Sequence, residues 1–124
     1  MLRTKCILLP PTKGDGLRIS VLSRHTLEDG FGWPYDLWLR DLAPLDYLIK
    51  RRCTGEISLA HYTKEYLEYL QEDKIAAIVI AVAKYALHKR VTLLGKEFVP
   101  TLCHRTILLW ECVQHEPDIH IQNF

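Results

Sequence analysis

Apolar residues along this chain fall into short runs that predict strands and longer periodic stretches that predict helices. Strands are expected over residues 4–9, 17–22, 91–94 and 119–122. Pro10-Pro11 stops the first strand, and Gly14-Asp15-Gly16 predicts a turn before the second. Helices are expected over residues 35–42, 45–52, 59–70, 74–88 and 106–113, and Ser58 is a suitable N-cap for the third of them.

The stretch 74–88 is apolar nearly all round, which is typical of a helix that is mostly buried. A narrow stripe of small or charged residues interrupts it, formed by Lys74, Ala77, Ala81, Lys84 and His88. A strand over residues 78–82 is the alternative, but the alanines and the length favour a helix.

Strands that alternate with helices late in the chain, and strands that are apolar on both faces, predict an α/β fold. We expect a single domain over residues 1–124, built as a three-layer helix–sheet–helix sandwich with a small, largely parallel sheet. A length of 124 residues suits one core, and 48% hydrophobic with 25% charged residues is ordinary for a globular protein.

The sequence also indicates the cellular compartment in which the protein is expected. The longest apolar run, residues 75–83, is about half of the roughly 20 residues that a membrane span needs. The first residues do not resemble a signal peptide, and the four cysteines include no Cys-x-x-Cys pair. We therefore expect a cytoplasmic protein with reduced thiols and no membrane partner.

The formal net charge is only +1, so the protein as a whole does not attract the negatively charged backbone of nucleic acid. A nucleic-acid partner is therefore disfavoured. Two basic pairs, Arg51-Arg52 and Lys89-Arg90, flank the ends of predicted elements. We interpret both pairs as solvated surface. The sequence leaves the identity of any cofactor unknown and leaves a homo-oligomer open.

Polar clusters follow two of the predicted strands. Residues 23–26 come after the strand 17–22, and residues 96–97 and 103–105 come after the strand 91–94. If these strands are parallel, both clusters lie at one edge of the sheet, where ligands of such sheets bind. The candidate site residues are Ser23, Arg24, His25, Thr26, Glu97, Cys103, His104 and Arg105.

The residue types favour an anion at this edge. The guanidinium groups of Arg24 and Arg105 can each donate two parallel hydrogen bonds to an anion. Backbone N–H groups near Cys103 and His104, at the positive end of a helix dipole, would donate to the same anion. Cys103 is a polarised donor or a nucleophile, and His25 and His104 suit acid–base roles. A structural alternative is that the two arginines form salt bridges with nearby carboxylates of the same chain.

These motifs resemble the family known as domain of unknown function 488 (DUF488). Residues 23–30 are similar to its "SRHT…DG" signature, residues 35–44 to its "YD.W…LAP" segment, and residues 103–105 to its "CHR" motif. Many members carry a cysteine where this chain has Gly95 and a histidine where it has Leu102. The resemblance implies an α/β fold with a site at these motifs, and it implies no particular reaction.

We predict that the protein binds a small anionic ligand, phosphate-bearing or nucleotide-like, at the carboxyl-terminal edge of the sheet. One alternative is a thiol-dependent enzyme that uses Cys103. A second is a non-enzymatic interaction module that binds nucleic acid through its basic pairs. No metal site is expected, because Cys112 and His115 form at best half of one.

Overall fold

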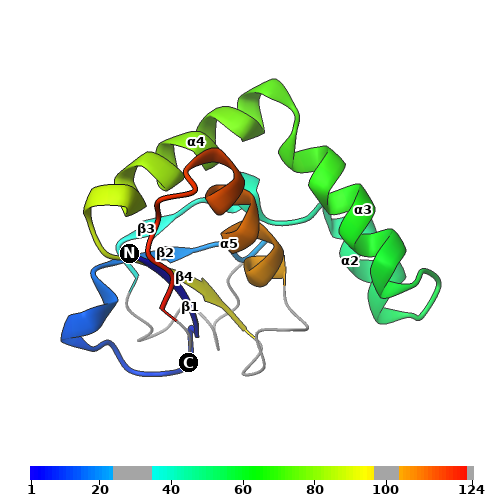
Figure 1. The fold of residues 1–124 in the computed structure, drawn as a ribbon. Coiled ribbons are helices and arrows are strands. Elements are labelled where there is room, and N and C mark those ends of the chain that lie inside the picture. Colours follow the sequence, from blue (N-terminus) through cyan, green and yellow to red (C-terminus); the bar gives the residue numbers. More distant parts are fainter. Residues whose placement is uncertain (24–34, 97–103, 123–124) are drawn as a thin grey trace.

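The computed structural model describes residues 1–23, 35–96 and 104–122 (Figure 1). The strands are β1 (Leu2–Cys6), β2 (Leu17–Ser20), β3 (Leu37–Trp38) and β4 (Val91–Gly95). The α-helices are α2 (Asp46–Cys53), α3 (Leu59–Leu70), α4 (Asp73–His88) and α5 (His104–His115). Two short 3₁₀ helices, η1 (Lys13–Asp15) and η2 (Arg40–Leu42), complete the set.

The four strands form one sheet in the order β1-β4-β2-β3, and every pairing is parallel. Strand β4 lies inside the sheet, with Val91 opposite Leu2 on one side and Leu17 on the other. All carboxyl ends therefore meet at one edge. The prediction of a small α/β domain with a parallel sheet is confirmed.

The first strand spans Leu2–Cys6 instead of the predicted residues 4–9. Two further predicted elements differ in kind from the structure. Residues 35–42 form β3 and η2 instead of a helix, because Asp36 ties this segment to the sheet edge. Its carboxylate accepts from the Arg18 backbone N–H at 2.8 Å, and its own N–H donates to the Arg18 carbonyl at 2.8 Å. Near the carboxyl end, residues 119–122 contribute an isolated parallel bridge between Leu2 and Ile121 rather than a full strand.

One face of the sheet carries the hydrophobic core. Ile19 and Leu93 from the sheet are buried against Val79 of α4 and Leu108 of α5. Helix α3 adds Tyr66, which is fully buried and donates its hydroxyl proton to the Leu42 carbonyl. Figure 1 shows these helices gathered on one side of the sheet.

The opposite face carries charge. Arg3 and Lys5 of β1 and Arg18 of β2 alternate with the core residues, and all three are buried around the Asp15 carboxylate. Thr92 of β4 donates to the Asp15 carbonyl at 2.7 Å. Among the described residues, the helices thus lie on one face of the sheet and a charged cluster under η1 lies on the other.

Gly16 allows Asp15 to reach this cluster. Its φ of 63° lies in the left-handed region, and an added Cβ would lie 2.2 Å from the carbonyl oxygen of Arg90. The turn predicted at residues 14–16 therefore forms as η1 followed by a residue that has to be glycine.

The Asp15 carboxylate holds the charged face together, so Asp15→Asn should destabilise the protein. Burial raises the pKa of Asp15, but hydrogen bonds from Thr12 and contacts with Lys5 and Arg18 outweigh it and lower the pKa below its usual value. We expect a loss of about 3 kcal/mol in the free energy of unfolding at neutral pH, measured by urea denaturation.

The pH dependence gives a second readout of the same substitution. A lowered folded-state pKa contributes stability that is present above the unfolded value of about 3.9 and lost as the pH falls below it. The difference between wild type and Asp15→Asn should therefore narrow below about pH 4. Glu56→Gln is the control, because it removes an exposed ion pair with Arg51 that is worth less than about 1 kcal/mol.

The start of α3 depends on a side-chain cap. The Ser58 hydroxyl accepts from the His61 backbone N–H at 3.1 Å, as the sequence predicts. Ser58→Ala should lower the free energy of unfolding by about 1 kcal/mol, whereas Ser58→Asp should retain most of it, because aspartate also accepts this hydrogen bond. Equal losses in both variants, measured by thermal or urea unfolding, would refute the capping role.

Candidate functional site

The carboxyl ends of β2 and β4 meet the start of α5, as the parallel sheet requires. Three of the predicted site residues are described, and they lie in this region: Ser23 after β2, and His104 and Arg105 in the first turn of α5. The other five lie outside the described residues: Arg24, His25, Thr26, Glu97 and Cys103.

His104 is held by two contacts of its ring. Its Nε2 donates a hydrogen bond to the Val21 carbonyl at 2.7 Å, and the ring meets Tyr66 edge-on with 5.9 Å between ring centroids. Because a carbonyl can only accept, Nε2 carries a hydrogen, and in the neutral ring Nδ1 is then the acceptor. The Val21 contact also joins the end of β2 to the first turn of α5.

Arg105 lies deeper than His104. Its side chain is 1% exposed, and it does not belong to the described lining of the pocket at this edge. Its role as an anion ligand therefore stays a prediction.

A pocket of about 310 Å³, here called the edge pocket, opens beside these strand ends. The segments after β2 and β4 supply Leu22, Ser23 and Lys96, and α5 supplies His104. The rest of its described lining comes from α2 and α3, which contribute Ile49, Arg52, Cys53, Leu59 and Tyr62. This volume is at the lower end of the range for small-molecule sites, roughly 300–1,000 Å³.

The polar part of the edge pocket is cationic. Lys96 and Arg52 bring two positive charges, and the described lining contains no carboxylate. The Arg52 guanidinium makes a long hydrogen bond of 3.5 Å to the Ile57 carbonyl. The Lys96 backbone is held to β1, because its carbonyl accepts from the Cys6 thiol at 3.1 Å.

Sequence reasoning missed Arg52 and Cys53 as site residues. The sequence predicts solvated surface for the pair Arg51-Arg52, and Arg51 does form an exposed ion pair with Glu56 at 2.9 Å. Arg52 instead lines the edge pocket. Only the tertiary structure distinguishes Arg52 from Arg51, because the difference depends on how α2 packs beside the strand ends.

The described thiols differ in accessibility. Cys53 is exposed in the edge pocket, whereas Cys6 and Cys112 are buried. Burial, with a smaller contribution from Glu111, raises the pKa of Cys112 to about 12, so this thiol is not a nucleophile. Within the described ranges, no three His, Cys, Asp or Glu side chains are grouped so that they could hold a metal ion.

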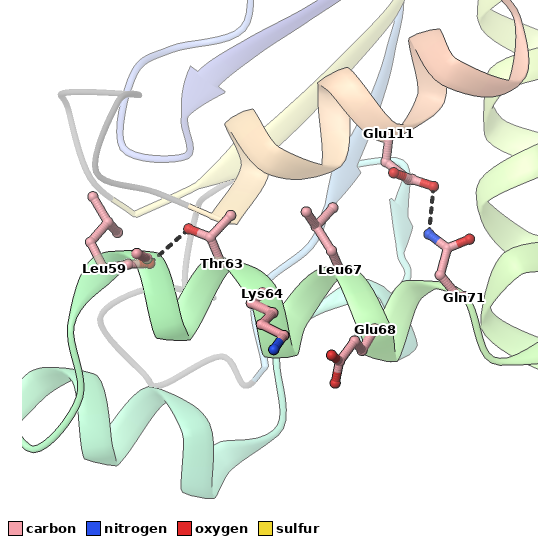
Figure 2. Close-up of a pocket in the computed structure, with 8 residues that line it drawn as sticks. Leu59, Thr63, Lys64, Leu67, Glu68, Gln71 and Glu111 are labelled. Atoms are coloured by element: carbon pink, nitrogen blue, oxygen red, sulfur yellow. Dashed lines mark hydrogen bonds between the residues drawn. The ribbon is translucent and has the colours of Figure 1, made fainter.

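A larger groove of about 760 Å³ lies between α3 and α5 (Figure 2). Gln71 donates to the Glu111 carboxylate across it at 2.7 Å, and Glu68 lies on the same surface. Two carboxylates and one lysine, Lys64, make this groove less suitable for an anion than the edge pocket.

Comparison with protein families gives a match over most of the chain. A family model, DUF488-N3a, described as the active DUF488-N3 subclade, matches residues 2–116. Neither the curated proteins nor the solved structures include a match. In the part of the chain that the structure describes, no helix is both long and apolar enough to cross a membrane. Because this family model covers more than half of the chain, the chain belongs to the DUF488 family.

Proposed function

We propose that this DUF488 protein binds a small anionic ligand, phosphate-bearing or nucleotide-like, in the edge pocket. The observation that carries the proposal is the charge of that pocket, where Arg52 and Lys96 come together without a carboxylate in the described lining. An arginine offers a planar fork of donors and a lysine a compact charge, and the two suit phosphate or carboxylate oxygens.

The position of the pocket supports the same proposal. It lies at the carboxyl edge of a parallel sheet, where ligands of open α/β sheets bind. His104 is the first residue of α5, a helix of 12 residues, so the positive end of the helix dipole adds to the two side-chain charges. Ser23 supplies a hydroxyl that can donate to the same anion.

The remaining lining selects for more than a bare anion. Leu22, Ile49, Leu59 and Tyr62 provide an apolar wall beside the cationic residues. A ligand that carries a ring or a short hydrocarbon next to its anionic group would bury apolar surface here. A phosphate ester therefore fits better than inorganic phosphate.

The candidate residues outside the described ranges complete the proposal. Cys103 directly precedes His104 in the chain, and we assign it the role of a polarised donor or nucleophile at the bound anion. The other contributors we propose are Arg24, His25, Thr26 and Glu97, with Arg105 as the buried charge of the same helix turn.

Titration calorimetry with adenosine monophosphate tests the pocket directly. Arg52→Gln and Lys96→Gln should each weaken binding about tenfold or more, because each removes a charge-assisted hydrogen bond worth about 1.5–3 kcal/mol. Arg51→Gln is the matched control, since it removes the same charge from the neighbouring residue outside the pocket. Equal losses in all three arginine and lysine variants would show a diffuse electrostatic effect and refute a site in the edge pocket.

The exposed thiol of Cys53 provides an independent footprint. Alkylation of Cys53 by iodoacetamide, mapped by mass spectrometry, should slow severalfold in the presence of saturating adenosine monophosphate, because the ligand would cover this wall of the pocket. In Lys96→Gln the same protection should require about ten times more ligand, in line with the weaker binding expected of this variant. If the alkylation rate is the same with and without the ligand, under conditions where calorimetry detects binding, the anion binds outside the edge pocket.

A further inference from the structure

The two positive charges of the edge pocket limit the kind of anion that suits it. Arg52 at the end of α2 and Lys96 after β4 carry these charges, and the described lining holds no carboxylate. The Arg52 guanidinium meets a neutral group, the Ile57 carbonyl, at 3.5 Å. The neighbouring Arg51 instead meets the Glu56 carboxylate at 2.9 Å, so its charge is already balanced. The charge of Arg52 is therefore left for a ligand of the pocket.

The other polar groups of the pocket also favour negative charge. Ser23 offers a hydroxyl that can donate a hydrogen bond. His104 begins α5, and the backbone N–H groups of a first helical turn carry a partial positive charge. An imidazole is neutral or positive, so the His104 ring does not oppose an anion. The lining, as described, therefore matches more than one negative charge.

Most of the apolar lining comes from the faces of two helices. Ile49, Arg52 and Cys53 share a face of α2, because residues three and four positions apart are neighbours on a helix. Leu59 and Tyr62 share a face of α3 for the same reason. The volume of about 310 Å³ thus combines one apolar wall with one cationic region. A phosphate monoester has the matching form, because its phosphate is a terminal group, whereas a phosphodiester carries organic groups on both sides of the phosphorus.

Resting on the function proposed above, we infer that the edge pocket selects the dianion of a terminal phosphate monoester over singly charged anions of the same shape. At neutral pH a phosphate monoester carries a charge of about −1.5 to −2, because its second pKa is about 6. A phosphodiester or a sulfate ester carries a single negative charge. Bound beside Arg52 and Lys96, such a ligand leaves one cation of the pocket without a counter-charge, and this is costly in a partly enclosed site.

Titration calorimetry with two esters of adenosine tests the selection. Adenosine 5′-monophosphate and adenosine 5′-sulfate share the nucleoside and a tetrahedral end group, but they differ by one negative charge above the second pKa of the phosphate. At about pH 7.5 the phosphate should bind at least about tenfold more tightly than the sulfate. The additional charge strengthens the bonds from Arg52 and Lys96 by an amount comparable to one charge-assisted hydrogen bond.

The pH dependence separates the charge of the ligand from the charges of the protein. As the pH falls from about 7.5 to about 5, the phosphate gains a proton, and its affinity should approach that of the sulfate. In the described lining, the groups that can titrate are Cys53 of α2, Tyr62 of α3 and His104 of α5, beside Arg52 and Lys96. The sulfate ester meets the same groups and keeps its own charge over this range, so its affinity corrects for their titration.

Single substitutions assign the selection to the edge pocket. Arg52→Gln and Lys96→Gln should each reduce the preference for the phosphate severalfold, because one cation then remains. Arg52→Lys keeps the charge and should keep most of the preference. Arg51→Gln is the matched control and should leave the preference unchanged, since Arg51 does not belong to the described lining. Circular dichroism checks that each variant is folded, and if Arg52→Gln is not, Lys96→Gln decides.

Failure of this inference differs from failure of the proposed function. If neither ester binds, or if the two glutamine variants of the pocket change neither affinity, both proposals are wrong. If the esters bind equally at about pH 7.5 and these variants weaken both alike, the edge pocket binds anions without selecting their charge, and only this inference is wrong. A preference for the phosphate that both variants leave intact also overturns it.

Discussion

Burial of three cations on one face of a small sheet is the constraint on which this fold depends. Arg3, Lys5 and Arg18 belong to strands that also build the core, so their side chains cannot leave the sheet for solvent. The Asp15 carboxylate offsets part of that charge, and the turn that ends in Gly16 holds it there. A buried ion cluster of this kind costs desolvation and tolerates few alternative pairings, which favours one register of the strands.

The one-sided arrangement of helices has consequences at two places. Packing α2, α3 and α5 on the core face brings the end of α2 beside the strand ends, and this creates the cationic edge pocket. Helix α4 packs on the same face, and an apolar groove lies where it passes β2 and β3. The edge pocket and this groove are thus products of the same layering.

Local signals in the sequence were sufficient for most elements. The apolar run that predicts α4 and the Ser58 cap of α3 are properties of a few neighbouring residues, and the structure confirms the helix and the cap. The expectation that α4 is mostly buried was wrong, because only five of its 16 residues are buried. The helix predicted at residues 35–42 was wrong, because the bonds between Asp36 and Arg18 join positions 18 residues apart. Propensity cannot report such a contact.

The candidate site was predictable in location but not in composition. A parallel sheet places its strand ends together, so Ser23 and His104 could be assigned to one edge from the chain alone. Arg52 reaches the same pocket from a helix with no local mark that distinguishes it from Arg51. The partner of the charged face could not be predicted either. The alternation of Arg3 and Lys5 with apolar residues indicates a polar face, but it does not indicate which residue neutralises it.

The hydrogen bond from His104 to the Val21 carbonyl has a further consequence. The acceptor is a backbone carbonyl, so the ring is anchored to the main chain just after β2 and not to a side chain that a substitution could remove. An exchange of the side chain at position 21 would therefore leave this bond available, and the start of α5 would stay tied to the end of β2.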